Sequence, residues 1–351
     1  MNKFYSLKVL EIESLTAESV KIVFDTTDLE IFNFKAGQYI TLRHEINNED
    51  VRRSYSLSSA PSEDIEIGVK RIENGLMSTF LTKELKVGDS IDVMPPTGNF
   101  YLDAKENDSH YVAICAGSGI TPVLSMIKQV LNDNTNTYFT LIYGNQTSNS
   151  IMFANELQLL ENKFQSQLFI HYIFSRQDVV DCLKGRIDKI MLEDLFRSSK
   201  NLDKADAYFV CGPGEMIDNV DQFLKDSGAE SNKIHFERFT SGISPKKNSS
   251  KIIKTKEIMS NVMVSVDGDD FEFQLSSKGE TILDAAMNAG ADVPFSCKGG
   301  VCCVCKAKVI EGKVRMDQNY SLSEEEVSQG YILGCQSHPE SDHVVVDFDE
   351  M

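Results

Sequence analysis

Four cysteines near the C-terminus follow a spacing that strongly restricts what this part of the chain can fold into. Cys297, Cys302 and Cys305 form a C-x4-C-x2-C pattern, and 29 residues separate Cys305 from Cys335. Five of the eight cysteines in the 351-residue chain fall within this 39-residue stretch. The spacing is that of four thiolates that hold a plant-type [2Fe–2S] cluster. The loop around the first three cysteines is therefore predicted to wrap tightly around two irons and two sulfides.

The residues between these cysteines suit a cluster better than another use of the thiols. Gly299 and Gly300 let the backbone approach the sulfur atoms and adopt any positive φ that the loop needs. A structural zinc site usually has two short chelate pairs, whereas this pattern has one C-x2-C pair, so zinc and buried free thiols are the lesser alternatives. Cys303 lies between two predicted ligands and its Cβ points in another direction, so we predict that it packs without binding the cluster.

The hydrophobic pattern divides the chain into three predicted domains and a linker. Residues 1–103 hold short β-branched or alternating runs, with one helical stretch at Met77 to Leu85, which predicts a small antiparallel β-barrel. Residues 104–239 alternate almost wholly apolar strands with helical patterns, which predicts an α/β domain with a doubly wound sheet. Residues 240–257 are polar and rich in Lys and Ser, as in an exposed linker. Residues 258–351 predict a hairpin, an amphipathic helix and the cysteine loop.

Two motifs in the predicted barrel could bind a flavin nucleotide. Residues 53–56, RSYS, lie on a predicted strand, where an Arg can reach a phosphate and a Tyr ring can pack on an isoalloxazine. This tetrapeptide alone also fits any surface strand. Residues 75–79, GLMST, form a glycine turn that leads into a helix, whose free N–H groups and positive dipole end suit a pyrophosphate. An ordinary capped helix is the alternative, because Ser and Thr are good capping residues.

Two further motifs, in the predicted α/β domain, suit a pyridine dinucleotide. Residues 117–122, GSGITP, join a buried strand to a helix, and a glycine-rich turn at this end of a strand is where doubly wound folds bind dinucleotides. Pro122 suits the first helical turn, where no backbone donor is needed. Residues 208–213, YFVCGP, end another buried strand, so Cys211 is predicted to lie beside the nicotinamide or, alternatively, to be an ordinary buried thiol.

Arg176 indicates which dinucleotide is used. Ser175 and Arg176 follow the third parallel strand, and an Arg there accommodates a 2′-phosphate, whereas an acid would hold the free ribose diol. Asp178 lies close by in the sequence, and an Arg on the surface can also be merely solvated. We predict NADPH as the preferred electron donor, with NADH as the alternative.

Taken together and in this order, the motifs resemble those of the ferredoxin–NADP reductase family fused to a C-terminal plant-type ferredoxin. The resemblance covers essentially the whole chain and is weakest in the linker. It implies an FAD-binding barrel, an NAD(P)-binding α/β domain and an α+β ferredoxin domain of the β-grasp type. It also implies an oxidoreductase with FAD and a [2Fe–2S] cluster as cofactors. A hydride carries two electrons and a plant-type cluster accepts one at a time, so a flavin is needed between them.

The resemblance also implies roles for individual residues. Those implied at the FAD are Arg53, Tyr55, Ser56, Val69, Gly75, Met77, Ser78, Thr79 and Phe239. Those implied at the pyridine nucleotide are Gly117, Gly119, Thr121, Pro122, Ser175, Arg176, Cys211 and Gly212. The implied cluster ligands are Cys297, Cys302, Cys305 and Cys335. The implied catalytic residues are Ser56, near the flavin N5, Cys211, facing the nicotinamide, and Glu237, near the flavin.

The charge of the chain bears on its partners. The formal net charge is −18, which argues against binding to nucleic acids or to anionic membrane surfaces. From Ile258 to the end, 17 Asp and Glu stand against 6 Lys and Arg, a net charge of −11. Solubility alone would account for such a charge, but we predict an acidic docking face on the ferredoxin domain. The resemblance implies that this face meets an oxygenase, for which a di-iron enzyme is predicted.

Other acceptors and another class of function stay open at this point. The acceptor could be a ring hydroxylase, a fatty-acid desaturase or a hybrid-cluster protein, and the chain could instead be a ferredoxin-like carrier whose other domains no longer turn over. The N-terminus lacks the apolar core of a signal peptide, and no run approaches the roughly 18 apolar residues of a membrane helix, so a cytoplasmic location is predicted.

Overall fold

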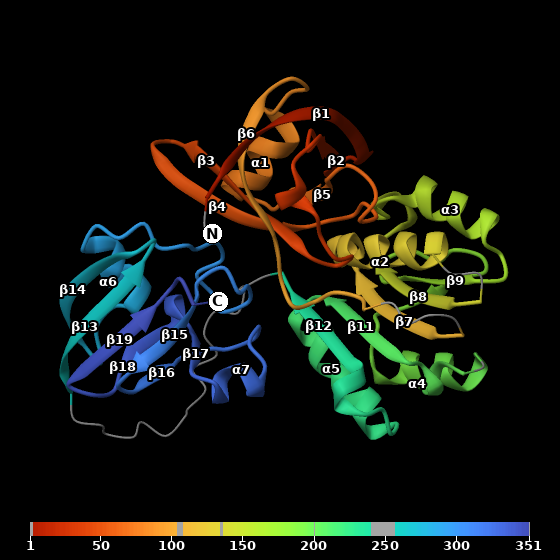
Figure 1. The fold of residues 1–351 in the computed structure, drawn as a ribbon. Helices are drawn as coiled ribbons and strands as arrows, with labels where there is room; N and C mark the ends of the chain where they lie inside the picture. Colours follow the sequence, from red (N-terminus) through yellow and green to blue (C-terminus); the bar gives the residue numbers. More distant parts are fainter. Residues whose placement is uncertain (1–2, 104–107, 134–135, 200, 240–256, 351) are drawn as a thin grey trace. The chain divides into compact units, whose positions relative to one another are not determined.

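The computed structural model describes residues 3–103, 108–133, 136–199, 201–239 and 257–350 of the chain. The chain divides into two compact units, one of residues 4–239 and one of residues 240–351 together with 1–3 (Figure 1). The predicted linker, residues 240–257, lies outside the described residues except for Glu257.

The N-terminal part of the first unit is the predicted antiparallel β-barrel. Its strands have the order β4-β3-β6-β1-β2-β5, and a bridge between Leu57 and Ile67 joins the chain after β4 to β5. The bounds are β1 (Tyr5–Thr16), β2 (Ser19–Phe24), β3 (Tyr39–Ile46), β4 (Glu49–Ser56), β5 (Glu66–Lys70), α1 (Leu76–Lys83) and β6 (Ser90–Thr97). Alternate side chains such as Val93 of β6 point inward, and Met77 of α1 is buried in the same core. Helix α1 begins one residue before the predicted helix and ends two residues before its end.

Residues 110–239 form the predicted doubly wound α/β fold. Its parallel strands have the order β10-β9-β8-β7-β11-β12. The strand bounds are β7 (His110–Ala116), β8 (Tyr138–Asn145), β9 (Leu168–Phe174), β10 (Leu183–Lys184), β11 (Ala207–Gly212) and β12 (Ile234–Arg238). The helix bounds are α2 (Ile120–Asp133), α3 (Ala154–Lys163), α4 (Lys189–Ser198) and α5 (Gly214–Asp226).

This sheet is buried on both faces. Along β7, Tyr111 and Cys115 point into one apolar cluster, whereas Val112 and Ile114 point into another on the opposite face. Helices α2 and α3 cover the first face, and α4 and α5 cover the second (Figure 1). Both faces of each strand therefore require apolar side chains, which is why the strand sequences are almost wholly apolar.

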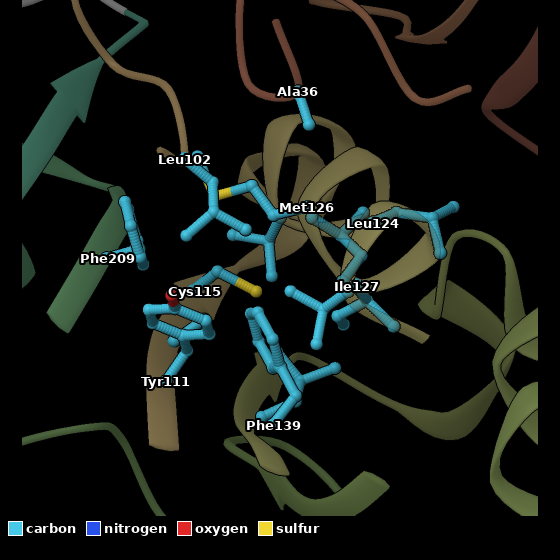
Figure 2. Close-up of a cluster of buried hydrophobic side chains, with 14 of the residues drawn as sticks. Ala36, Leu102, Tyr111, Cys115, Leu124, Met126, Ile127, Phe139 and Phe209 are labelled. Carbon is cyan, nitrogen blue, oxygen red and sulfur yellow. The ribbon is translucent and has the colours of Figure 1, made fainter. Parts of the chain in front are cut away.

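The barrel and the α/β fold pack on each other through small residues. Figure 2 shows Ala36 of a barrel loop pointing toward helix α2 and Leu102 beside Met126 of that helix. A Cβ atom on Gly37 would lie only 2.4 Å from Met126 Cε, and Gly37 has φ +106°. Glycine is therefore required at this position, both for space and for backbone conformation.

Residues 257–350 form the predicted α+β domain. A mixed sheet has the order β14-β13-β19-β15-β17, in which β13 and β19 are parallel. The bounds are β13 (Met259–Val266), β14 (Asp269–Ser276), α6 (Ile282–Asn288), β15 (Lys306–Glu311), β16 (Val314–Met316), α7 (Glu324–Ser328), β17 (Tyr331–Leu333), β18 (Ser337–Pro339) and β19 (His343–Asp347). Strands β13 and β14 form the predicted hairpin. The Thr281 hydroxyl caps α6 by accepting from the Asp284 N–H, and Leu283 of α6 is buried with Val264 of β13.

The helices of the described ranges are too short or too polar to cross a lipid bilayer.

Candidate functional site

The RSYS residues lie at the end of β4, beside the barrel core. Side chains alternate along a strand, so Arg53 and Tyr55 share one face of β4 and Ser56 lies on the other. Arg53 is exposed, and its Nη1 donates to the Arg52 carbonyl at 2.7 Å. Tyr55 packs against the edge of the core. An exposed guanidinium on the same face as a half-buried ring can meet a phosphate and an aromatic ring of one ligand.

The Ser78 hydroxyl orders the turn that precedes α1. Its Oγ accepts a hydrogen bond from the Ile72 N–H at 3.1 Å, and both Met77 and Ser78 are buried. Gly75 is the N-cap residue of α1. Because glycine has no side chain, no side-chain hydrogen bond caps this end of the helix. The N–H groups of the first turn of α1 can therefore face an anion, while the hydroxyl of Ser78 holds the turn that presents them.

Three other residues predicted at the FAD differ in what they offer a ligand. The Val69 side chain is fully buried in the barrel core, so this residue can present only its backbone. The Thr79 N–H donates to the Gly75 carbonyl at 3.1 Å, and the Thr79 side chain is half-buried. Phe239 is 37% exposed, just after β12.

The GSGITP turn packs directly against the end of β11. A Cβ atom on Gly119 would lie 2.2 Å from the carbonyl oxygen of Cys211, so glycine alone fits there. Gly117 has φ +56°, and its carbonyl accepts from the Tyr143 hydroxyl at 3.0 Å. The buried Thr121 donates from Oγ1 to the Ser118 carbonyl at 3.1 Å. The two motifs predicted at the pyridine nucleotide are thus in contact.

Pro122 and Gly212 complete this junction. Pro122 is buried in the first turn of α2, as its fixed φ and missing donor allow. A Cβ atom on Gly212 would lie 2.7 Å from Met216 Cε and 3.3 Å from the Ala116 nitrogen. Glycine at position 212 therefore lets the carboxyl ends of β7 and β11 and the Met216 side chain pack closely together.

A row of side chains crosses three neighbouring strands at Cys211. Cys115 of β7 is the partner of Cys211 on one side, and Glu237 of β12 is its partner on the other. Ser56 Oγ donates to Glu237 Oε2 at 2.9 Å, although the two residues are 181 positions apart in the sequence. The three residues predicted to be catalytic therefore converge where the barrel meets the parallel sheet.

Burial controls the protonation of this row. Complete burial raises the pKa of the Cys211 thiol well above its usual value. Burial also raises the pKa of Glu237 to about 8, and the hydrogen bond from Ser56 opposes this rise. Near neutral pH the row therefore contains a neutral thiol and a mostly protonated carboxyl group.

Ser175 and Arg176 are exposed after the end of β9. Their N–H groups donate to the carbonyls of Asn145 and Gln146, both at 2.9 Å, which fixes the backbone at the edge of the sheet. Asp178 pairs with Lys184 at 2.9 Å. The Asp178 carboxylate, which left the choice between NADPH and NADH open, is thus already paired with the Lys184 ammonium group.

The four cysteines of the C-terminal pattern adjoin one another. The Cys302 thiol donates to Cys297 Sγ at 3.1 Å, and the Cys335 thiol interacts with both Cys297 and Cys305. Hydrogen bonds from Cys302 and Cys335, and then from backbone N–H groups, lower the pKa of the Cys297 thiol. One such donor is the Gly299 N–H, 3.3 Å from Cys297 Sγ. Backbone donors aimed at sulfur favour the thiolate, so these residues fit a cluster held by four thiolates.

Cys303 lies apart from these contacts. Its thiol donates to the Ser321 carbonyl at 3.5 Å, and burial raises its pKa to about 11.

Gly300, two residues before Cys302, has φ +71°, and a Cβ atom there would lie 3.1 Å from the Gln318 carbonyl oxygen. Of the two loop glycines, Gly300 therefore uses the positive φ that glycine allows, and Lys298 also has a positive φ.

Two residues that bear on the site were missed by sequence reasoning. A Cβ atom on Gly68 of β5 would lie 2.7 Å from both the Phe153 ring and Thr121 Cγ2, so Gly68 lets the nucleotide motif approach the barrel. A glycine inside a strand pattern indicates such close approach and could have identified it. Gln336 donates from Nε2 to the carbonyls of Lys298 and Cys335, at 3.1 and 2.8 Å, and so joins the two ends of the cysteine pattern. No sequence signal beyond its place after Cys335 points to that role.

Comparison with known proteins connects this geometry to a family. Family models match an oxidoreductase FAD-binding domain at residues 6–101, an oxidoreductase NAD-binding domain at 113–222 and a 2Fe-2S iron-sulfur cluster binding domain at 264–340. The chain is 41% identical to one of the subunits of 1,2-phenylacetyl-CoA epoxidase from Escherichia coli K12, over 99% of each protein. The chain belongs to the ferredoxin–NADP reductase family with a fused C-terminal [2Fe–2S] ferredoxin domain.

Other members of this family are similar over the same length. The ferredoxin reductase component of 3-ketosteroid-9-alpha-monooxygenase from Rhodococcus rhodochrous is 32% identical, and the match covers 97% of this chain and 96% of that one. The structure of phthalate dioxygenase reductase, described as modular for electron transfer from pyridine nucleotides to [2Fe-2S], has a TM-score of 0.62 and 26% identity, with 98% of each chain covered. The protein is therefore an oxidoreductase of this type.

We predict that Cys302 and Cys303 respond differently to substitution, although they are adjacent. Cys302→Ser should abolish the visible absorption of the cluster and its two irons per chain, because the Cys302 thiol contacts Cys297 Sγ within the group of four thiols. Cys303→Ser should retain both, because its thiol contacts Ser321 instead. Absorption spectra and iron content of the two purified variants check this assignment, and equal loss from both would contradict it.

A second prediction concerns Glu237 and the dependence of stability on pH. Its folded-state pKa of about 8 lies above its ordinary value of 4.5, so the folded protein binds the proton more tightly than the unfolded chain. Its contribution to stability is fully present below pH 4.5 and is lost as the pH rises through about 8. The slope is at most about 1.4 kcal/mol per pH unit, and solvent contact at the half-buried carboxyl group reduces it.

Glu237→Gln should flatten this decline, because the amide cannot ionise. The measurement is the melting temperature of wild-type protein and variant between pH 5 and pH 9. Glu230→Gln, at an exposed position before the same strand, is the control and should keep the wild-type slope. If the melting temperatures of wild type and Glu237→Gln fell equally with rising pH, ionisation of Glu237 would not destabilise the folded protein, and the prediction would be wrong.

Proposed function

We propose that this protein is the reductase component of an oxygenase system and passes electrons from NADPH, through FAD and a [2Fe–2S] cluster, to the oxygenase. In this proposal residues 1–103 bind FAD, residues 104–239 bind the nucleotide and residues 258–351 bind the cluster. The observation that supports it most strongly is the hydrogen bond from Ser56 to Glu237, in the same row as Cys211. It joins the flavin motif to the nicotinamide motif at one point.

In this proposal each half of the site has a separate task. Arg53 and the first N–H groups of α1 hold the FAD phosphates, and Tyr55 packs on the flavin ring. The bound flavin supplies the ability to accept two electrons as a hydride and to release them singly. The turn has open space beside Gly117, so its backbone can face the pyridine nucleotide, and Gly119 lets the turn pack on the end of β11, beside which the nicotinamide would lie.

The buried row has a proton-handling role in this proposal. The Glu237 carboxyl group holds a proton near neutral pH, and its Oε2 accepts a hydrogen bond from Ser56 Oγ of the barrel. The pair can donate a proton to a flavin edge that gains negative charge and can take it back on oxidation. Cys211 stays neutral and fills the space next to the nicotinamide without adding charge. The row thus orients the two rings and excludes water between them.

Proposed discrimination between NADPH and NADH depends on Arg176. Arg176→Ala should raise the KM for NADPH about ten- to a hundred-fold, since a charge-assisted contact contributes roughly 1.5–3 kcal/mol. The KM for NADH should change little. Arg197→Ala, which removes another exposed arginine of the same fold, is the matched control and should leave both constants unchanged. Steady-state ferricyanide reduction measures both KM values for wild type and the two variants, and a wild-type preference for NADH would overturn the proposal.

The proposed partner is the oxygenase of a phenylacetyl-CoA epoxidase, with a di-iron centre as the sequence predicts. Support comes from the 41% identity to one component of that system in Escherichia coli. A relative from a ketosteroid monooxygenase is 32% identical, which makes another oxygenase the second candidate. The partner must receive electrons one at a time at the cluster, so its docking surface must reach the domain that holds the cysteines.

Acidic residues lie at the same end of the C-terminal sheet as the cysteine loop. Ser265 of β13 pairs with Asp347 of β19, which pairs with Lys308 of β15. Strand β15 begins at Lys306, directly after Cys305, so the hairpin turn beyond Ser265 lies at the end that holds the cluster loop. Two inter-strand steps separate β13 from β15, a distance of about 10 Å.

Further acids belong to this end of the domain. Lys306 Nζ pairs with Glu326 of α7 at 2.8 Å, which attaches α7 to the start of β15. The acidic end therefore comprises Asp267, Asp269, Asp270, Glu324, Glu325 and Glu326. Because Lys306 offsets only one of these charges, the end is strongly negative and suits a basic patch on the oxygenase.

We predict that salt slows electron transfer to the oxygenase but not transfer within the reductase. Steering between charged surfaces is screened as the Debye length falls from about 10 Å at 0.1 M to about 3 Å at 1 M salt. Reduction of the purified epoxidase oxygenase component should slow about ten-fold over that range. Reduction of the protein's own cluster by NADPH should change less than about two-fold, because its cofactors belong to one chain.

A double variant of the acidic end and a single variant elsewhere serve as test and control. Asp267→Asn combined with Asp269→Asn should slow oxygenase reduction at 0.1 M salt and weaken its salt dependence. Asp203→Asn, an exposed acid of the α/β fold, should behave as wild type. If the rate of oxygenase reduction did not change across the salt range, the acidic end would contribute to solubility and not to docking. If the protein supported turnover of a ketosteroid oxygenase but not of the epoxidase, the proposed partner would be wrong.

A further inference from the structure

A buried lysine joins the barrel to the α/β fold. Lys128 of α2 has a side chain only 8% exposed, and its Nζ faces three carboxylates. The distances are 2.6 Å to Glu156 Oε1, 3.5 Å to Glu66 Oε1 and 3.8 Å to Glu63 Oε2. We call these four residues the Lys128 cluster. The ammonium group loses its water on burial, so it needs these carboxylates nearby, although Glu63 and Glu156 are themselves 47% and 34% exposed.

The members of the Lys128 cluster come from both halves of the first unit. Glu63 and Glu66 belong to the barrel, at the connection between β4 and β5, whereas Lys128 and Glu156 lie on α2 and α3. The Ser58 hydroxyl donates to Glu66 Oε1 at 2.8 Å, which fixes that carboxylate from the barrel side. Lys128 is therefore the cation that crosses the junction.

Hydrogen bonds next to the cluster hold the same connection. Ser125, one turn before Lys128 on α2, donates from Oγ to the Ser59 carbonyl at 2.5 Å. The Ser59 hydroxyl in turn accepts from the Glu66 N–H at 3.2 Å. The segment from Ser58 to Glu66 is thus attached to α2 by an ion cluster and by a backbone contact.

This segment connects the two motifs that must meet. It begins two residues after Ser56 of the flavin motif and ends at the first residue of β5, whose Gly68 leaves room for Thr121. Helix α2 begins with the residues of the nucleotide motif and carries Lys128 two turns later. A shift of α2 relative to this segment would therefore change the separation between the flavin motif and the nicotinamide motif.

We infer that Lys128 is a positioning residue that sets the distance between flavin and nicotinamide and so controls the rate of hydride transfer. The inference rests on the proposed function, in which a reduced pyridine nucleotide reduces a flavin beside Ser56. Without the ammonium group, Glu63, Glu66 and Glu156 repel one another across the junction and push the β4–β5 connection away from α3. The nucleotide still binds, because its contacts lie on the α/β fold alone.

Anaerobic stopped-flow reduction of the flavin by NADPH tests this role in the full-length holoprotein. Lys128→Met, which keeps the length but not the charge, should lower the limiting rate about ten- to a hundred-fold, since a misplacement near 1 Å costs on the order of a hundred-fold. The dissociation constant for NADPH should change less than about two-fold, and the flavin–nicotinamide charge-transfer absorption should weaken. Lys128→Arg should restore most of the rate. Lys189→Met, an exposed lysine in an ion pair of the same fold, is the matched control.

Hydrogen exchange gives a readout that does not depend on turnover. Lys128→Met should speed exchange in residues 57–66 and leave exchange in β11 and β12 unchanged. If that variant loses its flavin or does not fold, Glu156→Gln takes its place, because it removes the shortest contact and leaves Lys128 paired with Glu66. It should show the same pattern to a smaller degree.

Four results would separate the possibilities. An unchanged limiting rate in Lys128→Met, or equal losses in the Met and Arg variants, would overturn the positioning role. A loss confined to nucleotide affinity would also overturn it. A wild-type flavin that neither NADPH nor NADH reduces would contradict the proposed function instead, and the exchange rates would then decide whether the Lys128 cluster holds the junction.

Discussion

The close packing of the barrel on the α/β fold is the constraint on which the first unit depends. The flavin motif belongs to an antiparallel sheet and the nicotinamide motif to a parallel one, so neither fold brings them together by itself. Gly37 and Gly68 remove the side chains that would hold the two folds apart. The hydrogen bond from Ser56 to Glu237, at 2.9 Å, is close to ideal length and would weaken if the junction opened. Residues far from either motif therefore contribute to the site.

Cysteine has opposite chemistry at two places in this chain, and its surroundings explain the difference. Cys211 is enclosed by apolar strands and a protonated carboxyl group, so the neutral thiol is favoured. Cys297 receives hydrogen bonds from neighbouring thiols and from backbone N–H groups of its loop, so the thiolate is favoured. A thiolate binds metal and a thiol does not. Hydrogen-bond donors that point at the sulfur atom therefore distinguish Cys297, which favours the thiolate, from Cys211, which favours the neutral thiol.

The sequence predicted features that depend on local pattern and missed those that depend on packing. Apolar runs such as β7 predicted a sheet covered on both faces because every position of the strand must be apolar. The cysteine spacing predicted four adjoining thiols because it matches the spacing of the four ligands of a plant-type cluster. By contrast, the sequence did not indicate that the buried Ser78 hydroxyl accepts from the Ile72 N–H, a contact set by the shape of the turn. The partner Glu66 lies 62 positions before Lys128, so no periodicity could have paired them.

The central proposal is that electrons from the nucleotide reach the cluster within one chain, and freeze-quench electron paramagnetic resonance tests it most directly. Anaerobic protein is mixed with NADPH at several protein concentrations, and the signal of the reduced [2Fe–2S] cluster is followed in time. We predict that the signal appears after the flavin bleaches, with a rate constant that does not depend on protein concentration. A rate that rises in proportion to protein concentration, or a flavin that bleaches without any cluster signal, would contradict transfer within the chain.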